Sequence, residues 1–379
     1  MYLVDFMNAH SDNWQELLTE APFYLDVRTD KINDTVYYIL KYDMIQSDFS
    51  NPLVKEARGS IFREDEGKWV CVCWAMNKFH NYGEKYSDIN LIDWSTARVL
   101  QKVDGSLYKL WYDKNKWHVS TNGTIDAAKA ACGDQTFLDL FNSAIENIEW
   151  NWDELNKNYC YYFELTSPFN HIVVHYSGIH LWYLGCRNMV TGQEENLPLP
   201  FAGLYYPQQF KYYSLAECVA AAKEMGVDEE GYVVVDDEFH RIKIKGNEYL
   251  RLHKMRGNGP LTAQRVIEMW QKETLDDFVA YYPEFQEFTT SVTKVITRLI
   301  QLSDMAYMMT SQFEDIQSRA DFAQCAKRYS KILQGFLFAR LDNKCKSANE
   351  YYHSFRARNL ANYVNDNIKI KNVGVANDV

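Results

Sequence analysis

Long apolar runs are missing from this 379-residue sequence: no stretch reaches the ~18 apolar residues that a membrane-spanning helix needs. The first 14 residues contain neither a basic segment nor a long apolar one, so we expect no signal peptide. These absences predict a protein of the cytoplasm that has no membrane partner.

Closely spaced cysteines are also scarce. Of the eight cysteines, only Cys71 and Cys73 lie near each other, and no second pair completes a zinc-ligand set. We therefore expect reduced thiols in the core of a cytosolic protein, rather than disulfides or a zinc site.

Basic charge is not in excess. The sequence has 40 Lys and Arg against 51 Asp and Glu, a net charge of −11, which argues against nonspecific coating of nucleic acid. Residues 327–358 are a local exception, with eight basic residues and two acidic ones. This stretch fits either a solvated helix face or a surface that contacts RNA. Its candidate RNA-binding residues are Lys327, Arg328, Lys331, Arg356 and Arg358.

Proline is nearly absent after residue 260, where only Pro283 remains, and the sequence pattern changes at the same place. Residues 1–255 contain short runs rich in β-branched and aromatic residues, separated by turn residues, which predict strands with a few helices. After the breaker cluster at 256–260, apolar residues recur every three or four positions, as in 288–302. We predict an α+β domain over 1–255 and an all-helical domain over 256–379.

Individual elements of the first region can be predicted from the same patterns. Helices are expected at 13–20, 137–148 and 214–226, the last with Ser214 as its N-cap. Strands are expected at 37–44, 56–63, 68–76, 106–113, 116–121, 159–166, 171–176, 180–185, 231–237 and 241–252.

The segment KVDGSLYKLWY is the most informative part of the sequence. It contains the triad Lys102, Asp104 and Gly105, whose residue types suit covalent nucleotidyl transfer. A lysine amine can attack the α-phosphate of a nucleotide and hold the nucleotide as a phosphoramidate. The aspartate points to the same side of an extended strand as the lysine, and the glycine permits close backbone approach. A solvated hairpin with an Asp-Gly turn is the structural alternative.

Three further strings follow this one in order. Glu164 lies in the strand-like YYFELT, and Glu230 precedes the strand GYVVV. Lys243 and Lys245 alternate with isoleucines in RIKIK, which predicts that both lysines share one face while the isoleucines enter the core. The transfer reaction needs cations to neutralise phosphate charge and carboxylates to hold the water shell of a metal ion.

That order of motifs resembles the covalent nucleotidyltransferase superfamily of ATP-dependent ligases and capping enzymes. Within it, the sequence is similar to the phage RNA ligase 1 family of the T-even type. Two upstream strings strengthen the similarity: EARGSIFR, which carries Arg58, and NKFHNYGE, which carries Lys78. The resemblance covers roughly residues 35–255, whereas the helical tail matches only in type and position.

The resemblance implies a role for each matching residue. Lys102 is the implied nucleophile, and Lys243 and Lys245 are implied to hold the α-phosphate and its metal. Glu164 is implied to contact the ribose, and Glu230 to contact the water of the metal; both belong to the implied metal site.

Other matching positions are implied to complete the ATP pocket. Arg58 and Lys78 would hold the β- and γ-phosphates or the pyrophosphate product, and Tyr42 would lie at the same end. Asp104 and Gly105 would also line the pocket, and Tyr249 aligns with a tyrosine just after the lysine pair.

The sequence departs from the family pattern at two positions. His80 stands where the family has a second aromatic residue, and Asn122 replaces an expected basic residue. An amide can hydrogen-bond a phosphate or a ribose but brings no charge.

The resemblance implies an antiparallel, two-sheet nucleotidyltransferase domain followed by a helical domain that recognises substrate. The implied function is ATP-dependent RNA ligation with Mg²⁺ or Mn²⁺, in repair of tRNA or joining of single-stranded RNA ends, by a monomer. A DNA ligase or capping enzyme is an alternative within the superfamily. A non-catalytic RNA-binding protein on a decayed ligase fold is an alternative of another class.

Overall fold

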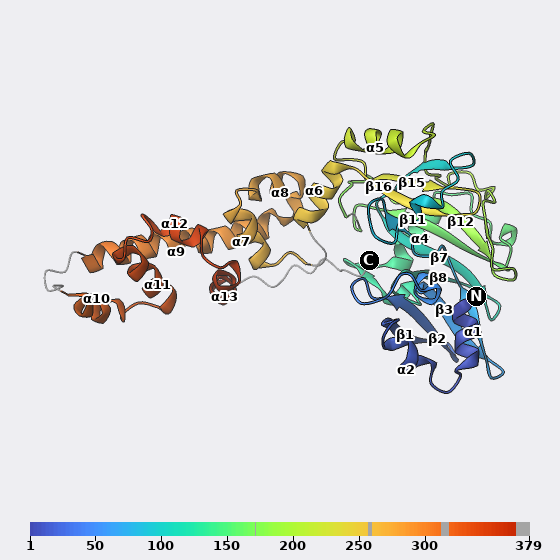
Figure 1. The fold of residues 1–379 in the computed structure, drawn as a ribbon, viewed down its shortest axis with the longest axis horizontal. Helices are drawn as coiled ribbons and strands as arrows, with labels where there is room; N and C mark the ends of the chain where they lie inside the picture. Colours follow the sequence, from blue (N-terminus) through green and yellow to red (C-terminus); the bar gives the residue numbers. More distant parts are fainter. Residues whose placement is uncertain (171, 257–259, 312–317, 369–379) are drawn as a thin grey trace. The chain divides into compact units, whose positions relative to one another are not determined.

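The computed structural model describes residues 1–170, 172–256, 260–311 and 318–368. The chain divides into two compact units, one comprising Met1–Lys254 and a second that begins at Met255. Of the breaker cluster at 256–260, residues 257–259 lie outside the described residues. Strands build the first unit and helices the second (Figure 1).

The N-terminal part of the first unit is a four-stranded antiparallel sheet in the order β1-β2-β3-β4. Its strands are β1 (Leu25–Ile32), β2 (Thr35–Tyr42), β3 (Arg58–Asp65) and β4 (Lys68–Cys73). The accompanying helices are α1 (Tyr2–Ala9), α2 (Trp14–Thr19) and α3 (Pro52–Glu56). Apolar residues of these helices, such as Leu3 and Trp14, pack with Leu40 and Phe62 of the sheet in one buried cluster.

Two five-stranded sheets form the rest of the unit, in the orders β13-β12-β11-β7-β8 and β14-β6-β15-β16-β5. The first contains β7 (Ser106–Asp113), β8 (Lys116–Thr121), β11 (Tyr159–Thr166), β12 (His180–Asn188) and β13 (Glu194–Glu195). The second contains β5 (His80–Asn81), β6 (Arg98–Gln101), β14 (Gln209–Phe210), β15 (Gly231–Val235) and β16 (Arg241–Lys245). Residues 102–105 connect β6 of one sheet to β7 of the other.

A helix packs on an apolar face of each of these two sheets. Phe137, Leu140 and Phe141 of α4 (Phe137–Ile145) pack on the core side of β11 and β12. Cys218 and Ala222 of α5 (Leu215–Lys223) pack on β15 and β16, and the Ser214 hydroxyl accepts a hydrogen bond from Glu217 N, as the predicted N-cap requires. Remaining elements are the ribbon β9 (Ala131–Cys132) with β10 (Gln135–Thr136) and 3₁₀ turns at Asp88–Asn90, Ala127–Lys129, Trp152–Glu154 and Pro283–Phe285.

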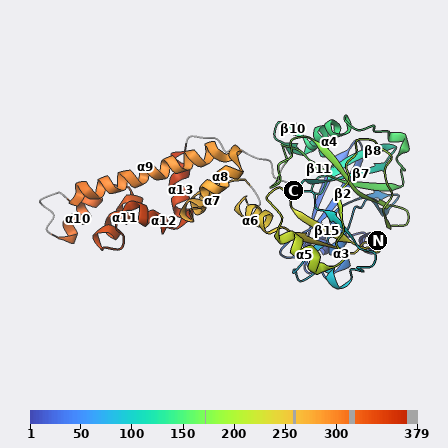
Figure 2. The same ribbon diagram turned by 90° about the horizontal axis from the view of Figure 1, so that it is seen from above.

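The second unit is helical throughout its described residues. Its longest element, α9 (Gln286–Ser311), buries Val292, Ile296 and Leu299 against neighbouring helices, as the spacing predicts (Figure 2). The other helices of this unit are α7 (Ala263–Gln271), α8 (Leu275–Tyr281), α10 (Arg319–Ala326), α11 (Lys331–Leu341), α12 (Ala348–His353) and α13 (Ala357–Asn367). Helix α6 (Asn247–Arg256) belongs to the first unit except for its last two residues.

The predicted number of sheets, two, is wrong. The described residues form four sheets, and β5 pairs with β16 in parallel rather than antiparallel fashion. Alternation along a segment predicts that it is a strand, but pairing depends on contacts between distant segments, which no single segment encodes.

Two predicted strands are also wrong. Residues 172–174 form bends and residues 175–176 are irregular, because the amides of Val173 and Val174 both donate to the carboxylate of Asp104; His171 lies outside the described residues. The run 241–252 is a strand only to Lys245, after which α6 begins, with Tyr249 and Leu252 buried one helical turn apart.

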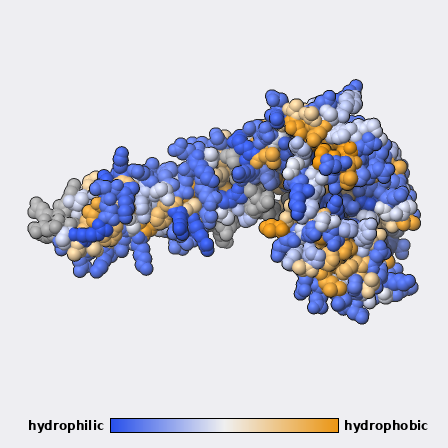
Figure 3. Space-filling view, in the orientation of Figure 1, coloured by the Kyte–Doolittle hydropathy of each residue, from blue (hydrophilic) through white to orange (hydrophobic). Residues whose placement is uncertain are grey.

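Hydrophilic residues cover most of the face shown in Figure 3, with hydrophobic residues in separate groups. Among the described residues, none of the helices combines the length and apolar character needed to cross a membrane. The eight cysteines are all free thiols.

Candidate active site

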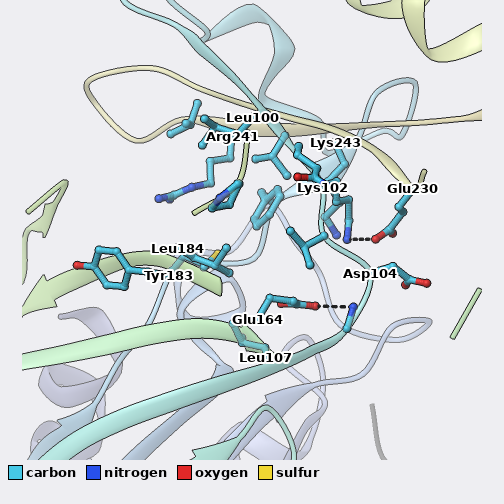
Figure 4. Close-up of a pocket in the computed structure, with 18 of the residues that line it drawn as sticks. Leu100, Lys102, Asp104, Leu107, Glu164, Tyr183, Leu184, Glu230, Arg241 and Lys243 are labelled. Atoms are coloured by element: carbon cyan, nitrogen blue, oxygen red, sulfur yellow. Dashed lines mark hydrogen bonds and ion pairs between the residues drawn. The ribbon is translucent and has the colours of Figure 1, made fainter. Parts of the chain in front are cut away.

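A cavity of about 690 Å³ is lined by residues from both five-stranded sheets. Leu100, Val233 and Lys243 line it from the β6–β15–β16 sheet, and Leu107 and Leu184 line it from the other sheet (Figure 4). This volume falls in the range of small-molecule sites.

Lys102, Glu230 and Lys245 meet at one end of this cavity. The Lys102 amine lies 2.6 Å from Glu230 Oε2, and the Lys245 amine lies 2.9 Å from Glu230 Oε1. The backbone is fixed as well, since Lys102 N donates to Gly231 O at 2.9 Å. One buried carboxylate, 3% exposed, therefore binds two lysines from separate segments of the chain.

Gly231 explains how these segments come so close. Its φ of +145° is unfavourable for other residues, and an added Cβ would lie 2.1 Å from Ile244 O of the paired strand β16. The Glu-Gly pair thus brings Glu230 against the strand that carries Lys245.

Burial and ion pairing set the charges of these groups. Burial alone would lower the pKa of the Lys102 amine, but the carboxylates of Glu230 and Glu164 outweigh it and raise that pKa. Burial would raise the pKa of Glu230, but Lys102 and Lys245 outweigh it and lower that pKa. Without a nucleotide, Lys102 is therefore held as an ammonium ion.

Lys243 occupies the same face of β16 as Lys245, while Ile242 and Ile244 enter the core, so the predicted alternation is confirmed. Burial, followed by repulsion from Lys102 and Arg58, lowers the pKa of the Lys243 amine to about 6. A cluster of cations with a depressed pKa is a site that an anion such as phosphate would stabilise.

Arg58, at the start of β3, lines the cavity, and its guanidinium carbon lies 5.1 Å from the centre of the Phe79 ring. Its Nη1 is buried and has no hydrogen-bond partner among the described residues; the same holds for Oδ1 of the cavity-lining Asn122. Such buried polar atoms call for a bound partner, and phosphate oxygens would suit the guanidinium.

Asp104 and Gly105 line the cavity, but protein groups engage the Asp104 carboxylate. Its Oδ2 accepts from Val173 N and Val174 N, each at 2.8 Å, and its Oδ1 accepts from the Tyr249 hydroxyl at 2.9 Å. A Cβ on Gly105 would lie 2.4 Å from Leu165 O, so this glycine is needed for contact with β11. The motif braces the loop that carries Lys102.

Glu164 reaches the cavity from β11, where its Oε1 accepts from Gly105 N at 3.2 Å (Figure 4). Burial raises the pKa of the Glu164 carboxyl to about 7, although Lys102 lowers it in part. A carboxyl group that can exist in either protonation state near neutral pH is typical of functional sites.

Tyr42 and Lys78 do not line this cavity. The Lys78 side chain is buried, and its amine lies 4.8 Å from the centre of the Tyr42 ring and 3.6 Å from Met44 Sδ. His80 packs its ring between Phe49 and Tyr86, at 4.9 and 5.8 Å, so it fills an aromatic position in the core. The structure thus joins Tyr42 to Lys78 outside the cavity lining, although the charge of Lys78 contributes to the lowered pKa of Lys243.

Lys109 of β7 was not among the predicted site residues. Its side chain is fully buried, its amine donates to Gly59 O beside Arg58, and burial lowers its pKa. The signal was present in the sequence, because a lysine within the apolar run SLYKLWY is unusual in a strand with both faces covered.

The five candidate RNA-binding residues of the helical unit are all exposed. Lys327, Arg328 and Lys331 lie where α10 ends and α11 begins, whereas Arg356 and Arg358 lie at the start of α13. Helix α13 packs mainly on α7, and α10 and α11 pack on α9. The basic residues therefore form two groups on different helices.

The carboxylates of the cavity are candidates for binding a metal ion. The described residues contain no group of three or more His, Cys, Asp and Glu side chains that could hold a metal ion. Glu164 and Glu230 both line the cavity, and one or two carboxylates suffice for Mg²⁺, which keeps most of its water shell. The residues present fit such an ion bound together with phosphate, but not a protein-enclosed metal site.

The sequence of this chain matches a known protein family. The family model for RNA ligases of the T4 RNA ligase 1 type matches residues 56–249, just over half of the chain. The chain belongs to this RNA ligase family. The matched range includes Arg58 and every residue described above around Lys102.

Individual relatives agree with this family. A protein of Autographa californica nuclear polyhedrosis virus, named as a bifunctional polynucleotide kinase/RNA ligase, is 30% identical over 270 residues, 65% of this chain and 38% of the relative. An RNA ligase of Rhodothermus phage RM378 is 24% identical over 363 residues, 75% of this chain and 80% of the relative. The chain thus spans well under half of the viral relative.

Solved structures resemble this family member only weakly. An archaeal ATP-dependent RNA ligase covers 88% of this chain and 78% of its own, with 11% identity and a TM-score of 0.42. A Naegleria gruberi RNA ligase covers 48% of this chain and 58% of its own, with 14% identity and a TM-score of 0.36.

The buried carboxyl of Glu164 generates a prediction on stability. The pKa of this carboxyl in the folded protein, about 7, lies above its ordinary value of 4.5, so the protonated carboxyl stabilises the folded protein at low pH. This stabilisation is lost as the pH rises from about 4.5 to about 7. Glu164→Gln removes this loss. In thermal unfolding without nucleotide, we expect the melting temperature of the variant, relative to that of wild type, to be higher at pH 8 than at pH 5.

The matched control is Glu229→Gln, because Glu229 is exposed. It should shift the melting temperature by the same small amount at both pH values. An equal shift for Glu164→Gln at pH 5 and pH 8 would show that burial does not perturb this carboxyl.

Proposed function

We propose that this family member is an ATP-dependent RNA ligase that joins an RNA 5′-phosphate to a 3′-hydroxyl through a lysine–AMP intermediate. One observation carries the proposal: the Lys102 amine opens into a cavity together with Lys243, Lys245 and Arg58. A nucleophile beside several basic side chains suits attack on a polyphosphate.

The lining of the cavity suits the base of ATP, the nucleotide that we propose. Leu184 of β12 and Val233 of β15 are partly buried apolar residues that line it from different sheets, which suits a planar base. Glu164 is available for the ribose hydroxyls, and Lys243, Lys245 and Arg58 for the phosphates. Lys78 and Tyr42 could reach only phosphates that extend beyond the cavity, as they do not line it.

In the first step, the neutral Lys102 amine attacks the α-phosphorus. The bond from that phosphorus to the bridging oxygen of the β-phosphate breaks, and pyrophosphate leaves. The amine must first lose a proton, and Glu230 Oε2 is its nearest acceptor, at 2.6 Å. The neighbouring lysines stabilise the charge that develops on the phosphate.

A divalent ion such as Mg²⁺ or Mn²⁺, bound with ATP, would supply further charge neutralisation. Glu230 and Glu164 would hold its water shell. Because Lys102 and Lys245 occupy both oxygens of Glu230, binding through water fits better than direct ligation.

Two further steps complete the proposed reaction. AMP passes from Lys102 to the RNA 5′-phosphate, and the 3′-hydroxyl of the second end then attacks that phosphate and releases AMP. We propose that residues 256–379 recognise the RNA and that broken tRNA is a physiological substrate.

The alternatives are less compatible with the structure. DNA ligases and capping enzymes usually follow the lysine strand with a β-barrel, whereas the described residues from 260 onward contain helices and no strand. A decayed, non-catalytic fold would not be expected to retain Lys102, Glu230 and Lys245 in mutual contact.

The chemistry can be tested with labelled ATP. Label in the α-phosphate should remain on the denatured protein, and label in the γ-phosphate should not, because pyrophosphate leaves. Lys102→Ala should abolish the adduct, since alanine offers no nucleophile. Lys114→Ala, at an exposed turn, is the control and should label normally. Full labelling of the Lys102 variant would rule out the proposed nucleophile.

The paired strand lysines provide a quantitative prediction. Lys243→Ala and Lys245→Ala each remove positive charge where negative charge develops, so the rate of adduct formation should fall by about 100-fold or more. The measurement is single-turnover labelling at saturating ATP. If either variant matched Lys114→Ala, its lysine would be an ordinary surface residue.

The helical unit provides a separate prediction about RNA. The double reversal Arg356→Glu with Arg358→Glu should weaken RNA binding and flatten its salt dependence, while adduct formation stays normal. Reversal of Lys327 and Arg328 tests the other basic group in the same way. Lys272→Glu, exposed at the end of α7, is the matched control. Unchanged sealing of a broken tRNA stem-loop by both double reversals would make these groups solvated helix faces.

A further inference from the structure

Strand β12 carries aromatic residues beyond the cavity. Leu181 and Tyr183 pack in the core with α4, so the alternating residues His180 and Trp182 lie on the opposite face. Trp182 is the cross-strand partner of Glu164, and Glu164 is the partner of Leu107; Glu164 and Leu107 both line the cavity. The face that forms the cavity therefore continues along β12 through Trp182 to His180.

Tyr205 adds a third ring to this face. Its ring centre lies 4.6 Å from that of His180 and 5.1 Å from that of Trp182. Its side chain is 44% exposed, whereas His180 and Trp182 are partly buried. We name these three residues the aromatic platform.

The aromatic platform is held rigidly. Tyr205 N donates to Leu181 O at 3.1 Å, and Tyr183 N donates to Tyr205 O at 2.8 Å, so the Tyr205 backbone pairs with β12. The Trp182 indole donates to Thr166 Oγ1 at 3.0 Å. Rings fixed in this way lose little conformational freedom when a ligand stacks on them.

We propose that the aromatic platform stacks an unpaired base at the RNA end that the cavity seals. This inference rests on the proposed function, because RNA ligation requires a terminal nucleotide to lie beside the cavity. Aromatic rings stack on any base of single-stranded nucleic acid. Two contacts connect the platform with the cavity: Trp182 pairs with Glu164, and Tyr206, next to Tyr205, lines the cavity.

An unpaired RNA base fits this surface better than a phosphate group does. Two of its three rings, those of Trp182 and Tyr205, carry no charge and offer a phosphate no ion pair. Binding through the platform should therefore depend little on salt, in contrast to binding through the basic groups of the helical unit.

The test uses the full-length protein and a short single-stranded oligoribonucleotide. Binding is measured by fluorescence anisotropy at several salt concentrations for wild type, Tyr205→Ala and Tyr205→Trp. Tyr213→Ala is the matched control, because Tyr213 is 70% exposed and does not line the cavity. Labelling with α-labelled ATP is measured for each protein.

We expect Tyr205→Ala to weaken binding about tenfold, with the same salt dependence as wild type and normal labelling. Tyr205→Trp should bind at least as well as wild type. An oligoribonucleotide that lacks its terminal base should bind wild type about tenfold more weakly, and Tyr205→Ala should then cause no further loss.

Equal affinities of wild type and Tyr205→Ala for the intact oligoribonucleotide would overturn the proposal. It would also be overturned if Tyr205→Ala weakened binding of the oligoribonucleotide without its terminal base as much as binding of the intact one. A loss in Tyr205→Ala that Tyr205→Trp does not restore would also overturn it, because stacking needs only an aromatic ring. Failure of wild type to form the adduct would instead overturn the proposed function, so the two failures are distinguishable.

Discussion

The carboxylate of Glu230 is the interaction on which the candidate site depends. It is buried and binds the amines of Lys102 and Lys245, which come from the β6–β7 connection and from β16. Removal of either lysine would leave a buried charge partly unpaired, which is costly. Through Glu230, the two segments and the strand β15 that follows it are fixed relative to one another. The same pairs keep the Lys102 amine charged, so the proposed nucleophile must lose a proton before it can attack.

A second set of buried contacts supports this arrangement. Asp104 binds the amides of Val173 and Val174 and the hydroxyl of Tyr249, and the Tyr249 ring lies 4.7 Å from the Lys245 amine. The loop that carries Lys102 is thereby connected to α6 and to β16, the strand of Lys243 and Lys245. Lys243, in contrast, lies among other cations: burial, followed by repulsion from Lys102 and Arg58, lowers the pKa of its amine. The polyphosphate of the proposed substrate would offset this repulsion between cations.

Local patterns in the sequence predicted the parts of the site that depend on neighbouring residues. The alternation of Lys243 and Lys245 with isoleucines is one example, and the strand that carries Glu164 is another. The number of sheets could not be predicted, because strand pairing joins distant segments. The predicted strand at 171–176 failed because a side chain, Asp104, takes up the backbone amides that a sheet would otherwise use. The surroundings of the Lys78 amine, which are aromatic rings and a methionine distant in sequence, could not be predicted from its neighbours in the chain.

The charge of the Lys102 amine tests this view of the site most directly. Its pKa can be measured by NMR titration of isotope-labelled lysine side chains, with Lys102→Arg to assign the signal, in wild type and in Glu230→Gln. We expect a pKa above the ordinary lysine value of 10.5 in wild type, because Glu230 and Glu164 outweigh burial, and a lower pKa in the variant. A pKa in wild type below the ordinary value, or no change in Glu230→Gln, would contradict the role assigned to Glu230.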